Sequence, residues 1–108
     1  MYVKNERPQD KRMNALKRQM MLTCYLYYFK DKQIITDDEW QRRANELAQL
    51  IHDNGYESGL WDDQFEGWTG DTGFHLKYDE WTRMQALHLV RICDEDTYQK
   101  IMEGPNVV

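Results

Sequence analysis

A helix with a defined start and stop lies in the middle of the sequence. Thr36-Asp-Asp-Glu39 has the capping-box form, in which the Thr hydroxyl accepts from the third helical amide and the Glu side chain reaches back to the Thr amide. Asn54-Gly55 is a typical helix stop. The apolar residues between these signals recur at helical spacing: Trp40, Ala44, Leu47, Ala48 and Ile51. This pattern predicts an amphipathic helix that needs a second element to cover its apolar face.

The preceding segment supplies that element. From Gln9 to Phe29 there is no Gly or Pro. The apolar residues of this segment fall at spacings of three and four: Met13, Leu16, Met20, Cys24 and Tyr27. The half from Met20 to Phe29 is apolar nearly all round, which predicts burial on several sides. Together the two segments predict a helical hairpin over residues 9–54.

The helical pattern breaks over residues 55–77. Five glycines, two tryptophans and two phenylalanines are scattered there among acidic residues. Unstructured connections of this length are uncommon in compact domains. We therefore expect either a compact loop that packs its own aromatic rings, with or without a short β-hairpin, or a binding loop.

Two C-terminal helices complete the predicted fold. Residues 78–93 are periodic again, and Asp94 suits the N-cap of a short final helix that ends before Gly104-Pro105. A chain of 108 residues fits one domain. We therefore expect a single, mainly α domain over residues 1–108, made of the hairpin (9–54), an acidic aromatic loop (55–77) and two helices (78–103).

Charge and cysteine content limit the classes of partner. Fourteen Lys plus Arg against nineteen Asp plus Glu give a net charge of −5, which argues against nucleic-acid binding because phosphate contacts need a basic face. A weaker alternative, a DNA-transaction accessory factor, would use the basic residues of the first helix: Lys11, Arg12, Lys17 and Arg18. No apolar run is long enough to span a membrane, and no secretory segment follows Met1. Two cysteines make no disulfide framework, so we expect a cytoplasmic protein.

The sequence contains no recognisable catalytic pattern. No phosphate-binding loop follows a strand, and the glycines of residues 67–73 do not open a long helix. The three histidines lack metal-ligand spacing, and the acidic residues lack the pattern of a calcium loop. We therefore expect neither an enzyme nor a metal site.

Residues 25–47 carry a recognisable signature. The aromatic cluster Tyr25-Leu-Tyr-Tyr28 is followed by Asp31 and then by Ile35-Thr-Asp-Asp-Glu-Trp-Gln41. This arrangement resembles the N-terminal Ia domain of bacterial NAD-dependent DNA ligases. In that domain, a helix ending in Tyr-x-Tyr-His/Tyr leads through an Asp and Ile-x-Asp-x-Glu-Tyr-Asp into a second helix.

In these ligases the hairpin binds the nicotinamide mononucleotide (NMN) half of NAD. The resemblance implies these ligand-facing residues: Tyr27, Tyr28, Asp37, Trp40 and Gln41. Three depart from the ligase pattern, since Tyr28 replaces the usual His, Trp40 the usual Tyr and Gln41 the usual Asp. The chain also lacks a Lys-x-Asp-Gly adenylation motif, so we expect no ligase activity.

The first functional hypothesis is a small, non-enzymatic, phage-encoded protein that binds and modulates a host protein. Small stand-alone proteins with such a hairpin resemble accessory proteins of bacteriophages. Because interfaces favour aromatic anchors, we expect the partner-binding residues to be exposed in the acidic aromatic loop. They are Trp61, Asp62, Asp63, Phe65, Glu66 and Trp68.

The alternative, from a different class, is a module that binds NMN or NAD. Aromatic faces at Tyr27 and Trp40 can stack on a pyridinium ring in a cation–π contact. A carboxylate at Asp37 can accept hydrogen bonds from ribose hydroxyls or from the carboxamide. The simplest interpretation keeps Tyr25, Tyr27 and Trp40 as the interface between two helices, with Asp37 and Glu39 acting only as caps.

Overall fold

The structure, a computed structural model, describes residues 6–73 and 75–93. Within these ranges it contains helices and no strands, which confirms the mainly α fold. The helices are α1 (Pro8–Phe29), α2 (Asp37–Asn54), α3 (Asp62–Phe65) and α4 (Glu80–Cys93). The final short helix predicted up to residue 103 lies outside the described residues.

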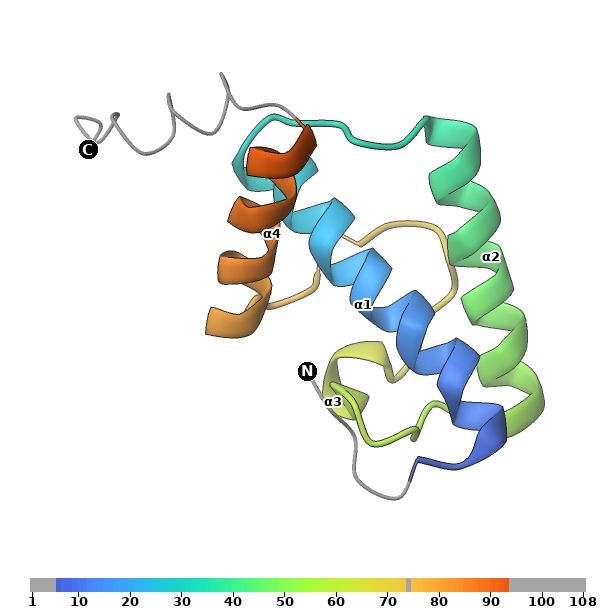
Figure 1. Cartoon of the computed structure of the whole chain (residues 1–108). Coiled ribbons are helices and arrows are strands. Elements are labelled where there is room, and N and C mark those ends of the chain that lie inside the picture. Colours follow the sequence, from blue (N-terminus) through green and yellow to red (C-terminus); the bar gives the residue numbers. More distant parts are fainter. Residues whose placement is uncertain (1–5, 74, 94–108) are drawn as a thin grey trace.

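Helix α1 is the central element of the fold. Figure 1 shows α1 running between α2 on one side and α4 on the other, and it contacts both. Pro8 occupies its first turn, where a missing N–H leaves no helical bond unmade. Met13, Leu16 and Met20 are fully buried, as their spacing predicts. The helical hairpin of α1 and α2 is therefore present, with α1 covered on two sides.

The last turn of α1 differs from the prediction. The apolar run from Met20 predicts burial up to Phe29, and this is correct as far as Leu26, which is fully buried. Tyr27, Tyr28 and Phe29 are instead 54%, 39% and 64% exposed. This turn is followed by the connection of residues 30–36, and α2 begins only at Asp37.

Helix α2 begins at the predicted cap, but only half of the capping box forms. The amide of Glu39 donates to Oγ1 of Thr36 at 3.1 Å. The Glu39 carboxylate does not return to Thr36; it accepts from Arg42 and Arg43 on its own helix. Gly55 ends the helix with φ of 86°, a conformation that favours glycine.

Residues 55–77 pack their own aromatic rings, as the compact-loop alternative predicts. Phe65 is fully buried and Trp68 is 5% exposed. The indole Nε1 of Trp68 donates to the carbonyl of Ala44 in α2 at 3.1 Å. The loop therefore completes the core beneath the hairpin, and it contains one helical turn, α3, that the sequence does not reveal.

Lys17 holds the first part of this loop against α1. Its side chain is fully buried, and Nζ donates to the carbonyls of Tyr56 (2.8 Å) and Leu60 (3.0 Å) and to the carboxylate of Asp62 (3.1 Å). Nζ also lies 5.5 Å from the centre of the Phe65 ring. Burial lowers the pKa of Lys17, while Asp62 acts in the opposite direction.

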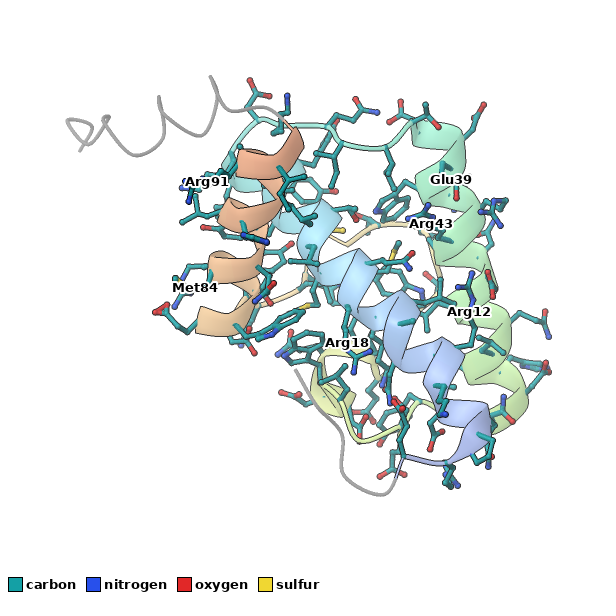
Figure 2. The ribbon with its side chains drawn as sticks, viewed as in Figure 1. Arg12, Arg18, Glu39, Arg43, Met84 and Arg91 are labelled. Atoms are coloured by element: carbon teal, nitrogen blue, oxygen red, sulfur yellow. The ribbon has the colours of Figure 1, made fainter. Side chains whose placement is uncertain are left out.

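Helix α4 packs on the other side of α1 through a narrow apolar face. Ala86 and Val90 are fully buried in a cluster with Leu26. Figure 2 shows Met84 and Arg91 on the side of α4 that faces away from α1. None of the described helices has the length and apolar character needed to cross a membrane.

Candidate ligand pocket

A pocket of about 330 Å³ lies at the end of the hairpin where α1 finishes and α2 begins. We call it the hairpin pocket. All the residues that the ligase resemblance singles out line it: Tyr27, Tyr28, Asp37, Trp40 and Gln41. Figure 1 shows that α1 and α2 diverge toward this end and that residues 30–36 bridge them, so the pocket residues come from the two helix ends on either side of this connection.

Aromatic rings form part of the wall. The rings of Tyr27 and Tyr28 lie 5.1 Å apart, nearly perpendicular at 88°. The Trp40 ring, half-buried, lies 6.5 Å from the buried Trp68. Tyr27 is too exposed for a residue of the interface between α1 and α2. Tyr25 is buried, but its cluster contains Ala86 and Val90 of α4, so the simplest interpretation is wrong for both tyrosines. These rings offer π-faces to a flat or cationic ligand.

Two carboxylates give the hairpin pocket its charge. Asp37 is the first residue of α2, and its Oδ1 accepts from Nε2 of Gln33 at 2.9 Å. Asp71, from the loop after α3, accepts from the hydroxyl of Thr69 at 3.0 Å. Neither carboxylate forms an ion pair with any residue that the structure describes. None of the twelve lining residues, all of them described, is Lys, Arg or His.

Gln41 fastens the loop that closes the hairpin pocket. Its Nε2 donates to Oδ1 of Asn45 at 2.9 Å and to the carbonyl of Gly70 at 2.8 Å. Both amide hydrogens therefore have protein acceptors, which leaves the carbonyl oxygen as the polar atom for a ligand. The resemblance makes Gln41 a ligand contact, whereas its contacts here position the residues that follow Gly70.

Cys24 lies on the α1 wall, where the loop approaches very closely. A Cβ at Gly73 would lie 2.3 Å from Sγ of Cys24, so the approach depends on glycine. Burial raises the pKa of the Cys24 thiol to about 11, with hydrogen bonds involving Trp40 and Thr23 acting in the opposite direction. The thiol is therefore neutral at pH 7 and is no activated nucleophile.

Sequence reasoning missed the contribution of the loop to the hairpin pocket. Asp71 and Thr72 line it, and the Thr72 hydroxyl lies 3.3 Å from the hydroxyl of Tyr28. The available signal was the pair of glycines that flank these residues, because Gly70 and Gly73 mark a close backbone approach. Nothing in the sequence indicates that this approach is to α1 and α2.

The expected partner-binding loop does not present an exposed aromatic surface. Phe65 and Trp68 belong to the core, so the prediction that they are exposed anchors is wrong. Trp61 is half-buried, and its Nε1 donates to Asp79 at 2.7 Å. Asp62 accepts from Lys17 and from the amides of Ser58 and Gly59. Of the six residues, two acidic ones are exposed: Asp63 and Glu66.

The expected basic face of α1 is also incomplete. Lys17 is buried, so its assignment to an exposed face is wrong. The guanidinium of Arg12 pairs with the carboxylate of Glu46 at 2.7 and 2.8 Å. Figure 2 shows Arg12 and Arg18 on different sides of α1, as a spacing of six residues requires. These residues do not form one continuous basic surface.

Metal binding finds no support among the described residues, where no three His, Cys, Asp or Glu side chains gather closely enough to hold an ion. Comparisons with protein-family models, with curated proteins and with solved structures found no match to this chain. The functional argument therefore depends on the hairpin pocket and its own residues.

Proposed function

We propose that this chain is a non-enzymatic binding protein whose hairpin pocket takes the nicotinamide half of NMN or NAD. The observation that carries this proposal is the convergence of five residues, singled out from sequence alone, on one pocket: Tyr27, Tyr28, Asp37, Trp40 and Gln41. The resemblance to the ligase Ia domain supplied the residues, and their common location supports the assignment.

The chemistry of the hairpin pocket suits this ligand. The rings of Tyr27 and Trp40 can contact the faces of a pyridinium ring. Asp37 has one carboxylate oxygen bonded to Gln33, which leaves the second to accept from a ribose hydroxyl or the carboxamide. A volume of about 330 Å³ is at the lower end of the usual range for small-molecule pockets. It fits one ring with its sugar better than a complete dinucleotide.

Thermal unfolding with and without NMN tests the proposal. A ligand at 100 times its dissociation constant adds about 2.7 kcal/mol to the free energy of unfolding, which raises the melting temperature of a domain this small by roughly 10 °C or more. We expect Asp37→Ala to lose this shift. Asp38→Ala is the matched control, because Asp38 is exposed in the same helical turn but does not line the hairpin pocket.

The thermal shifts of the two variants and of the unmodified chain decide between binding in the hairpin pocket, binding elsewhere and no binding. Equal shifts in both variants would mean that NMN binds elsewhere, and the absence of any shift in the unmodified chain at millimolar NMN would remove the proposal. Quenching of tryptophan fluorescence gives a second readout, and Trp40→Phe assigns the quenching to the ring in the hairpin pocket.

Binding of a host protein by a phage-encoded chain is the second candidate. The observation that favours it is the exposed aromatic turn at the end of α1, where Phe29 is 64% exposed although it stacks against Tyr25. Aromatic residues of this kind are typical interface anchors. Phage origin and a bacterial host rest on the resemblance alone. Affinity capture from bacterial lysate should lose its partner with Phe29→Ser and keep it with the control Gln49→Ser; equal capture would remove this candidate.

A further inference from the structure

The charged side chains that line the hairpin pocket are all acidic. Its lining includes the carboxylates of Asp37 and Asp71 and no basic side chain. Neither carboxylate is neutralised by an ion pair with a described residue. A site of this kind attracts cations and repels phosphate, which proteins usually hold with Arg, Lys or backbone amides at a helix N-terminus.

The start of α2, beside the hairpin pocket, is a position where a phosphate would ordinarily bind. Helix N-termini attract anions because their first amides are unpaired and the helix dipole is positive there. Here the first turn already carries Asp37, Asp38 and Glu39, and Thr36 accepts from the Glu39 amide. Glu39 is paired with Arg42 and Arg43, so the carboxylates that oppose a phosphate at this position are those of Asp37 and Asp38.

From these observations we infer that the hairpin pocket recognises the positive charge of an N-substituted pyridinium ring and makes no use of a phosphate. This inference rests on the proposed function and narrows it. The ligand class is an N-ribosylated or N-alkylated nicotinamide cation. When NMN binds, the ring and ribose enter between the tyrosines, Trp40 and the two carboxylates, and the phosphate stays in solvent.

Two consequences distinguish this site from a nucleotide-phosphate site. Nicotinamide riboside, which has the ring and ribose of NMN without the phosphate, should bind at least as tightly as NMN. Reduced NMN keeps the phosphate but its ring is neutral, so the cation–π contact and the attraction to both carboxylates are lost. Its affinity should be lower by roughly tenfold or more.

Isothermal titration of the full chain with four probes measures these differences: nicotinamide riboside, NMN, reduced NMN and 1-methylnicotinamide. We expect the riboside to match or exceed NMN, and 1-methylnicotinamide to bind detectably because it retains the cationic ring. Asp71→Asn should weaken the riboside by about fivefold and leave reduced NMN unchanged, because the amide keeps the shape but not the charge. Asp63→Asn is the control, an exposed acid outside the hairpin pocket.

The results distinguish failure of the charge-based inference from failure of the proposed function. NMN binding tenfold more tightly than the riboside, or reduced NMN binding as tightly as NMN, would overturn the charge-based inference while the proposed function stands. Failure of all four probes to bind would overturn the proposed function and the inference with it. Equal losses in Asp71→Asn and Asp63→Asn would show a general charge effect and would also overturn the inference.

Discussion

Replacing Lys17 by Met is expected to destabilise the fold strongly. Met keeps the apolar stem but removes the ammonium that bonds the carbonyls of Tyr56 and Leu60 and the carboxylate of Asp62. Each buried carbonyl left without a donor costs about 1–3 kcal/mol. The Lys17→Met protein also avoids the free-energy cost of burying the charged ammonium, which offsets part of this loss.

The carboxylate of Asp62 adds little to the loss. It is about one-third exposed, and it keeps the amides of Ser58 and Gly59 as donors. We therefore expect a net decrease of about 2–4 kcal/mol in the free energy of unfolding. For a domain of this size, that lowers the melting temperature by roughly 10–20 °C.

Thermal and urea unfolding followed by circular dichroism at pH 7 measure this loss. Lys11→Met is the matched control, since Lys11 is exposed on the same helix and its replacement should change stability by less than about 0.5 kcal/mol. Limited proteolysis gives a local readout, because release of the loop should expose residues 55–62 to cleavage. A Lys17→Met protein as stable as the Lys11→Met control would refute the role assigned to the buried ammonium.

Three further predictions concern the core and the pH dependence. Gly73→Ala should lower the melting temperature, because the new Cβ would lie 2.3 Å from Sγ of Cys24. Adding Cys24→Ala should recover part of this loss. A Gly73→Ala protein with an unchanged melting temperature would contradict the close approach. Tyr78→Phe should leave stability unchanged or raise it by up to about 1 kcal/mol, because the hydroxyl is buried without a hydrogen-bond partner among the described residues; a clear loss in urea unfolding would reveal a partner. Hydrogen bonds from two arginines lower the pKa of Glu39 from 4.5 to about 2, so the stability it contributes is present above pH 4.5 and lost as the pH falls toward 2. Melting temperatures over that range should fall less steeply for Glu39→Gln, and identical slopes would contradict the assignment.

Features that depend on near neighbours in the sequence could be predicted. The start of α2 is one, since the Thr36 hydroxyl needs only the amide of Glu39 three residues away. The return bond of Glu39 failed for a local reason as well, because Arg42 and Arg43 lie one turn further along the same helix and offer charged donors. The hairpin follows from patterns of this range, whereas its five pocket residues were supplied by the resemblance to the ligase Ia domain.

Features that depend on the path of the long loop could not be predicted. Lys17 belongs by sequence to a basic helix face, and its burial results from carbonyls and a carboxylate some forty residues away that converge on Nζ. In the sequence, Asp71 is one of several acidic residues in the loop. Its place in the hairpin pocket depends on the hydrogen bond from Nε2 of Gln41 to the carbonyl oxygen of the neighbouring Gly70, at 2.8 Å. Residue spacing along the chain therefore predicts neither the contacts of Lys17 with residues 56–62 nor the hydrogen bond of Gln41 to Gly70.

Chemical-shift mapping of the backbone amides of the full chain during titration with NMN tests most directly whether the hairpin pocket holds a nicotinamide ring. We expect saturable shifts concentrated in residues 23–28, 33–41 and 71–72, which surround the hairpin pocket. Shifts confined to the outer face of α4, or no shifts at millimolar NMN, would contradict the assignment of this pocket as a nicotinamide site.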